Sequence, residues 1–206
     1  MKRILAISVL LAAALFSIVS CSETKETDDH ANWKDRNASY ISSIASQCGD
    51  LTPQTASEGQ MFRLLSYKLN KQRNDWGDGS YVYCKVIKKD TGTESPHFTD
   101  SIRINYRVRL MPTANYPEGQ VVDRSFTTAS LNPDVNIPSS FKVSTLIDGA
   151  ATAIMNMHCG DYWIVYIPYG LGYGTNDRSG IPGYSTLIYE INLTEFAVPG
   201  QNLSKR

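Results

Sequence analysis

Histidine and cysteine, the side chains that most often bind metals or act as nucleophiles, are few and widely spaced in this sequence. The histidines are His30, His97 and His158. Beyond the N-terminal region, the cysteines are Cys48, Cys84 and Cys159. No two of these cysteines have the Cys-x-x-Cys spacing of a redox motif or zinc site, and three thiols allow at most one internal disulfide. The sequence therefore predicts neither a metal site nor a cofactor.

A fourth cysteine, Cys21, has neighbours that predict its modification by lipid. Lys2 and Arg3 precede an uncharged apolar run over 4–20, as in a secretory signal peptide. The residues Ile-Val-Ser before Cys21 resemble a bacterial lipobox, in which the cysteine is lipidated and becomes N-terminal after cleavage. A retained membrane anchor is the alternative, because about 17 residues is the lower limit for a spanning helix.

We therefore expect a signal peptide over 1–20 and a lipid anchor at Cys21. The protein would be held at the outer membrane of a bacterial cell envelope. The polar segment 22–30 is acidic, which resembles the export signal of some surface lipoproteins. Whether the protein faces the periplasm or the cell surface stays open.

Composition favours one folded domain with attachments, or at most two small domains. The chain has 206 residues, of which 42% are hydrophobic, and that share argues against wholesale disorder. Twenty basic and twenty acidic residues cancel, so we expect no field that would attract nucleic acid.

The elements that must position any site are mostly strands, and the clearest is 101–110. Its apolar positions are Ile102, Ile104, Tyr106, Val108 and Leu110. The alternate positions are Arg103, Asn105, Arg107 and Arg109. A period of two places one set on a core face and the other in water. We therefore interpret the three arginines as a solvated face, not as a nucleic-acid patch.

Other segments complete an α+β pattern. Aromatic and β-branched residues predict strands over 81–87, 162–167 and 186–193, with a further strand starting at 121–122. Helical spacing predicts helices over 33–47 and 146–157, and the type of 62–69 is ambiguous. We expect 130–140 to be an exposed excursion and 169–184 to be a glycine-rich loop. The pattern favours a helix covering one face of an antiparallel sheet.

From about Tyr81 to Phe196, the order of motifs resembles the FKBP-type peptidyl-prolyl cis-trans isomerases. The strongest matches are MHCG at 157–160, the strand ending in Ile-Pro at 167–168, and LGYG at 171–174. Ile-Pro at 181–182 and STLIYE at 185–190 follow at the family's spacing. Upstream matches are Asn-Tyr at 105–106, VDRS at 122–125 and FKVSTLIDG at 141–149. The segment 21–74 is not covered.

The resemblance implies an antiparallel sheet curled around one short helix, with an aromatic-lined pocket between them. It also implies catalysis of rotation about X-Pro amide bonds, whose barrier is about 18–20 kcal/mol. A twisted amide has lost resonance and carries less charge on its oxygen, so a dry apolar pocket favours it over the planar form. Such a reaction needs no nucleophile, metal or cofactor.

The resemblance assigns roles to individual residues. Tyr106 would line the pocket, Tyr173 would place its hydroxyl against a substrate carbonyl, and Asp123 would face the twisting amide. Ile147 would offer its backbone N–H to a substrate carbonyl. The other residues expected to bind substrate are Val122, Phe141, Leu146, Ala150, Ile181 and Tyr189. A role in the core alone is the alternative for the apolar residues.

Two residues depart from the family pattern and leave the activity open. Ala150 stands where the family has a pocket-floor tryptophan, and Val122 where a phenylalanine precedes the aspartate. Both changes remove aromatic area that would bind a prolyl ring, although Trp163 could fill the space. We therefore keep two functions: a prolyl isomerase that helps envelope or surface proteins fold, and a non-catalytic peptide-binding or chaperone module on the same anchor.

The predicted organisation follows from these assignments. A signal peptide spans 1–20, a lipidated tether that could contain a short helix spans 21–60, a lead-in segment spans 61–78, and the FKBP-like domain spans 79–198. The partners would be proline-containing polypeptides and, through the lipid, a membrane. Because the helix over 33–47 is short and lacks repeated heptads, we expect a monomer, with dimerisation through that helix as the alternative.

Overall fold

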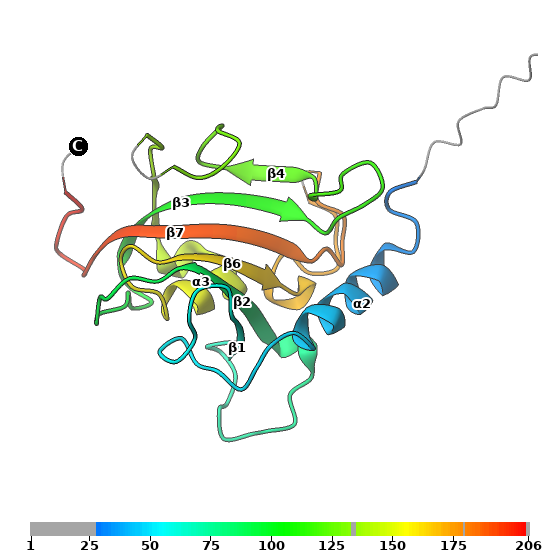
Figure 1. Cartoon of the computed structure of the whole chain (residues 1–206), viewed down its shortest axis with the longest axis horizontal. Helices are drawn as coiled ribbons and strands as arrows, with labels where there is room; N and C mark the ends of the chain where they lie inside the picture. Colours follow the sequence, from blue (N-terminus) through cyan, green and yellow to red (C-terminus); the bar gives the residue numbers. More distant parts are fainter. Residues whose placement is uncertain (1–27, 133–134, 179, 205–206) are drawn as a thin grey trace, which may run out of the picture.

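A seven-stranded antiparallel sheet forms the centre of the protein in a computed structural model that describes residues 28–132, 135–178 and 180–204 (Figure 1). The strand order is β1-β2-β6-β7-β3-β4, and β5 also pairs with β3. The strands are β1 Met61–Leu65, β2 Tyr81–Lys88, β3 Ser101–Leu110, β4 Val121–Arg124, β5 Ser139–Lys142, β6 Tyr162–Ile167 and β7 Leu187–Ala197. The predicted signal peptide and Cys21 lie outside the described residues.

The alternation along β3 gives the sheet two different faces. Ile102, Ile104, Val108 and Leu110 are buried, and they share one core with the alternate residues of β2, β6 and β7. We call this side of the sheet the inner face, because it carries the helix α3 (Asp148–Ile154). The predicted α+β fold, with a short helix on an antiparallel sheet, is therefore confirmed.

The helix α3 is shorter than the predicted range 146–157. Leu146 and Ile147 have extended backbone, with ψ of 159° and 150°, and the helix begins only at Asp148. The helix contacts β1, β2 and β6, and its small residues allow a close approach to the sheet. The β7 and β3 side of the inner face is left for the cavity described below.

Gly149 sets how closely α3 can approach β6. A Cβ atom at this position would lie 2.3 Å from Cγ2 of Ile167. Alanine has the higher helix propensity, by about 1 kcal/mol, yet we expect Gly149→Ala to lower the free energy of unfolding by about 1–3 kcal/mol because the overpacking dominates. Denaturant unfolding measures this change. The control is Gly79→Ala, where a Cβ meets nothing within 4 Å; equal stabilities of the two variants would contradict the prediction.

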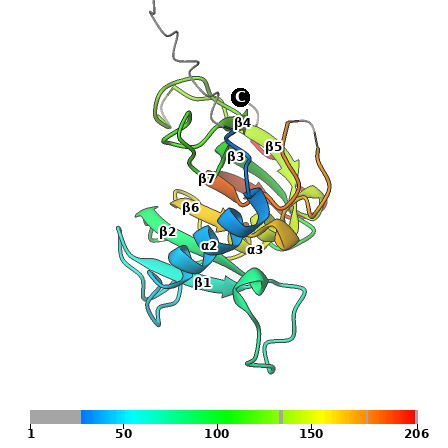
Figure 2. The ribbon, with the colours of Figure 1, turned by 90° about the vertical axis from the view of Figure 1, so that its right-hand side faces the viewer.

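A second helix, α2 (Trp33–Ala45), covers part of the opposite, outer face. Figure 2 shows α2 crossing in front of the β1, β2 and β6 side of the sheet. Its Ile41 and Ile44 form a cluster with Tyr83, whose side chain alternates with those of the inner face. The helix predicted over 33–47 is confirmed, although it ends two residues earlier.

The first turn of α2 is fastened to the segment that leads into β7. The indole Nε1–H of Trp33 donates to Oγ of Ser185 at 2.9 Å, and the backbone N–H of Thr186 donates to Oδ1 of Asn37 at 2.6 Å. Asn37 is buried, so its side-chain oxygen and the backbone N–H of Thr186 satisfy each other in a place where neither can bind bulk water. Together with β1, these contacts mean that the packed structure begins before residue 79, where the sequence placed the start of the domain.

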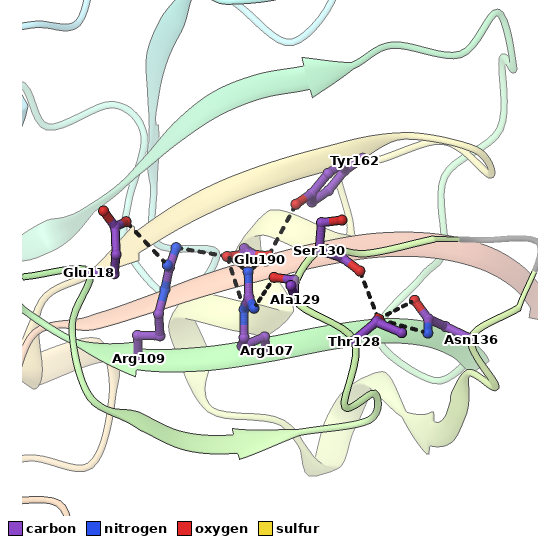
Figure 3. A network of polar contacts seen from close by, with 9 residues as sticks. All are labelled: Arg107, Arg109, Glu118, Thr128, Ala129, Ser130, Asn136, Tyr162 and Glu190. Atoms are coloured by element: carbon purple, nitrogen blue, oxygen red, sulfur yellow. Dashed lines mark hydrogen bonds and ion pairs between the residues drawn. The ribbon is translucent and has the colours of Figure 1, made fainter. Parts of the chain in front are cut away.

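The prediction of a solvated arginine face on β3 is wrong, because Arg103, Arg107 and Arg109 are each only 15–16% exposed and each pairs with a glutamate of β7. Arg107 and Arg109 both form ion pairs with Glu190 of β7, at 2.8 and 2.7 Å, and Tyr162 donates to the same carboxylate at 3.1 Å (Figure 3). The side chain of Glu190 is only 4% exposed. Arg107 also donates to the carbonyl of Ala129, so the loop after β4 helps to cover this network.

Candidate active site

A cavity of about 400 Å³ opens between the inner face, the segment before α3 and the loop before β7. Seven residues predicted from the sequence line it: Tyr106, Asp123, Phe141, Leu146, Ile147, Tyr173 and Tyr189. Four lining residues were not predicted as site residues: Ile104, Thr145, Gly172 and Arg178. The cavity therefore draws on β3, β4, β5, β7 and two connecting segments.

Tyr106 and Asp123 form one polar edge of the cavity. The Tyr106 hydroxyl donates to Oδ2 of Asp123 at 3.1 Å, and the backbone N–H of Arg124 donates to Oδ1 at 2.8 Å. Burial, and then the Asp123 carboxylate, raise the pKa of Tyr106 to about 12. The hydroxyl is therefore protonated at neutral pH and remains a donor.

The end of β4 is held against β3 at this edge. The backbone N–H of Tyr106 donates to Oγ of Ser125, and the backbone N–H of Ser125 donates to the carbonyl of Tyr106, both at 2.9 Å. These two bonds fix the distance between the strands next to Asp123. The carboxylate is thereby kept beside the cavity although its strand is short and exposed.

Phe141 supplies an aromatic wall. The pairing of β5 with β3 places Phe141 opposite Ile102, which settles the register that the sequence left uncertain. Its ring meets that of Tyr106 edge to face, with centroids 5.6 Å apart. Such pairs stabilise an aromatic surface beyond the area that they bury.

Ile104 and Tyr189 form the base of the cavity, because both are buried residues of the sheet. Burial raises the pKa of Tyr189, and the neighbouring hydroxyl of Tyr173 raises it further through charge and hydrogen bonding. Tyr173 comes from the glycine-rich loop, where Gly174 has a φ of +81° that favours glycine. The hydroxyls of Tyr173 and Tyr189 are thus close enough to interact at the cavity.

The segment before α3 presents a backbone donor. The N–H of Leu146 bonds to the carbonyl of Val143, and the carbonyl of Ile147 accepts from Ala151. Among the residues that the structure describes, nothing accepts a hydrogen bond from the N–H of Ile147. An N–H that has no partner in the described part of the chain and lies beside a cavity is suited to bind a carbonyl oxygen of a ligand.

Three predicted substrate-binding residues do not line the cavity. Ala150 is 2% exposed and lies in the core between α3 and the sheet, while Val122 and Ile181 pack on the same core. A tryptophan in place of Ala150 would therefore overpack the core rather than supply a pocket floor. Trp163 packs edge to face on Phe62 in the core, with ring centroids 5.2 Å apart, and it does not line the cavity.

Two of the unpredicted lining residues differ in how well the sequence could have revealed them. Ile104 lies two positions before Tyr106 on the same strand, so the period of two already placed it on the same face. Arg178 lies in the glycine-rich loop, where no periodicity applies, and no sequence signal placed its side chain at the cavity.

The part of the chain described by the structure holds no group of three or more histidine, cysteine or acidic side chains able to bind a metal ion. Cys48, Cys84 and Cys159 are free thiols. No helix within 28–132, 135–178 and 180–204 is both long and apolar enough to cross a membrane.

The cavity and its position agree with a comparison to protein families. A sequence profile described as FKBP-type peptidyl-prolyl cis-trans isomerase matches residues 92–194. The chain belongs to this family. The matched FKBP-type region runs from the segment before β3 into β7, and it contains every residue that lines the cavity.

Curated relatives are named as peptidyl-prolyl cis-trans isomerases. The chain is 30% identical over 110 residues to the peptidyl-prolyl cis-trans isomerase Mip of Coxiella burnetii. It is 31% identical over 112 residues to the FKBP-type 22 kDa peptidyl-prolyl cis-trans isomerase of Escherichia coli. These matches cover 53% and 54% of this chain, but only 42% and 48% of the relatives' own lengths. The chain thus spans less than half of each of these FKBP-type relatives.

Solved structures show the same FKBP-type fold. The crystal structure of FkpA from Escherichia coli matches with a TM-score of 0.55 at 20% identity, over 95% of this chain and 70% of that one. A peptidyl-prolyl cis-trans isomerase from Pseudomonas syringae pv. tomato matches with a TM-score of 0.54 at 18% identity, over 82% of this chain and 96% of that one.

Proposed function

We propose that this chain is a peptidyl-prolyl cis-trans isomerase that acts on proline-containing polypeptides at the cavity. The observation that carries the proposal is the combination of a tyrosine-lined cavity, with both apolar and polar walls, and the N–H of Ile147, which has no partner among the described residues. Membership of the FKBP-type family supports it.

The cavity suits catalysis of amide rotation because its side chains can bind a prolyl peptide without forming a covalent bond to it. Ile104, Phe141 and Leu146 offer apolar surface to a prolyl ring, and the described lining contains no serine, cysteine, lysine or histidine. A twisted amide carries less charge on its oxygen than a planar one, so moving it out of water costs less free energy. The Ile147 N–H would hold a neighbouring carbonyl, and Tyr173 would hold a second.

We further propose that the isomerase is anchored by lipid at Cys21 and works in the cell envelope on folding proteins. The lipobox-like residues before Cys21 support this placement. A relative from Legionella longbeachae, 30% identical over 110 residues, is named outer membrane protein MIP. Labelling with radioactive palmitate, in a host that processes lipoproteins, should mark the wild type and not Cys21→Ala.

The test of the activity is the rate of cis-trans exchange of a short proline-containing peptide, measured by NMR with the purified chain. Wild type should raise the exchange rate above that in buffer, and Tyr173→Phe should lower kcat/KM about three- to tenfold through loss of one hydrogen bond. Tyr116→Phe, at an exposed tyrosine that does not line the cavity, is the control. Exchange at the buffer rate with wild type would refute the enzyme.

A non-catalytic peptide-binding module is the second candidate. The observation that favours it is that no residue at 122 or 150 supplies an aromatic ring to the cavity. In that case the same peptide would shift the NMR signals of Tyr106 and Ile147 on titration while its own exchange rate stayed at the buffer value.

A further inference from the structure

Among the described residues that line the cavity, Arg178 is the only one with a positive charge. Its guanidinium lies over the ring of Tyr173, 5.7 Å from the centroid. Cation-π contact holds a side chain in place without neutralising its charge. A positive charge therefore stands next to the tyrosine that we expect to hold substrate.

The backbone of Arg178 is fixed although it lies in a loop. Its N–H donates to the carbonyl of Ile181 at 2.9 Å, and the N–H of Ile181 donates back at 2.6 Å. This two-way bridge pins the base of the side chain. Only the guanidinium end is then left to adapt to a ligand, which lowers the entropy cost of binding one.

No described acidic side chain neutralises Arg178. The adjacent Asp177 accepts a hydrogen bond from the backbone N–H of Gly183 at 2.8 Å, and no ion pair joins Arg178 to any residue within the described ranges. The other arginines of the sheet differ, because Arg107 and Arg109 are both paired with Glu190.

Asp123, the acidic residue that lines the cavity, differs from Arg178 because its side chain already has hydrogen-bond partners. Asp123 already accepts from the Tyr106 hydroxyl and from the N–H of Arg124. A bound polypeptide thus meets one carboxylate with partners and one guanidinium without a carboxylate. Neutral donors do not cancel the charge of a carboxylate, but they occupy its oxygens, whereas no described residue accepts a hydrogen bond from the Arg178 guanidinium. The guanidinium is therefore the charged group of the cavity that is left to bind a ligand.

From this asymmetry we infer that Arg178 determines specificity and favours polypeptides with an acidic side chain next to the prolyl bond. The inference rests on the proposed function, since it concerns the same cavity and the same class of substrate. Arg178 is exposed, so the preference is modest and depends on salt.

The experiment uses two sets of short peptides, with glutamate, glutamine or lysine placed immediately before or immediately after the proline. Exchange NMR gives kcat/KM for each peptide, and titration gives Kd. For wild type at low ionic strength, we expect the glutamate peptide to have a kcat/KM about two- to fivefold higher than the lysine peptide in at least one set, and a Kd lower by a similar factor. Addition of 0.5 M NaCl should reduce the ratio.

Two variants at position 178 and one control assign the effect. Arg178→Gln should bring the glutamate-to-lysine ratio close to one, and Arg178→Glu should invert it. Arg63→Gln removes an exposed arginine of β1 that does not line the cavity, so the wild-type ratio should remain.

The outcomes separate this inference from the proposed function. A glutamine peptide that exchanges at the buffer rate refutes the isomerase, while the Kd ratios still decide the role of Arg178. A wild-type ratio near one, or a ratio that Arg178→Gln and Arg178→Glu leave unchanged, overturns the inference even if exchange is accelerated.

Discussion

Replacing Ile147 by proline is expected to lower kcat/KM for a prolyl peptide at least tenfold while the protein stays folded. The substitution removes the N–H that has no partner within the described part of the chain. The backbone already suits proline, because φ at Ile147 is −59° and Leu146 before it is extended. The loss therefore falls on the ligand, whose carbonyl would be left without a donor.

The matched control is Ile147→Ala, which removes most of the same side chain and keeps the N–H. The difference in kcat/KM between the alanine and proline variants isolates the backbone donor. Thermal unfolding of both variants checks that the segment before α3 is intact. If the two variants were equally active, the N–H would have no part in binding the substrate.

Removing the Glu190 carboxylate is expected to produce a large loss of stability. Arg107 and Arg109 are 16% and 15% exposed, and Glu190→Ala would leave both guanidinium groups and the Tyr162 hydroxyl without this acceptor. Deleting one partner of a buried ion pair costs about 3–5 kcal/mol, because the remaining charge stays largely desolvated. At about 2–4 °C per kcal/mol, the melting temperature should fall by about 10 °C.

Glu195→Ala is the matched control on the same pair of strands. Glu195 also pairs with an arginine of β3, Arg103, at 2.7 Å. Arg103 is 16% exposed, like Arg107, but the Glu195 carboxylate is 28% exposed and pairs with one arginine, whereas Glu190 is 4% exposed and pairs with two. Water can replace the lost partner there, so the expected cost is about 1 kcal/mol or less. Equal losses in the two variants would show that burial of Glu190 does not set the energy of its network.

The predictable parts of the structure are those set by local spacing. The period of two along β3 correctly placed alternate residues on the core face, namely Ile102, Ile104, Val108 and Leu110. Successive side chains of a strand point to opposite sides in any fold. Likewise Pro168 ends β6, since proline has no N–H for the ladder. The resemblance to the FKBP-type family correctly predicted that Tyr106, Phe141 and Tyr189 line one cavity.

The period of two along β3 does not reveal what covers the face that carries the arginines. Arg107 and Arg109 alternate with apolar residues as a solvated set would, yet Glu190 lies opposite Arg107 on β7, 83 residues later in the chain. The alternation says only that the arginines share a face. Pairing between distant strands, and the cover from the loop at Ala129, decided that this face is largely dry.

By itself, the sequence determined β2, β3, β4, β6 and β7, the two helices and a tyrosine-rich wall, because dihedral preference and side-chain period act within a few residues. It left β1 ambiguous and did not predict β5. Only the tertiary structure decided that Ala150 lies in the core, that Arg178 lines the cavity, and that the N–H of Ile147 has no partner among the described residues. These outcomes depend on how closely α3 and the loop before β7 approach the sheet. That distance is set by contacts such as Gly149 on Ile167, which join residues far apart in the chain.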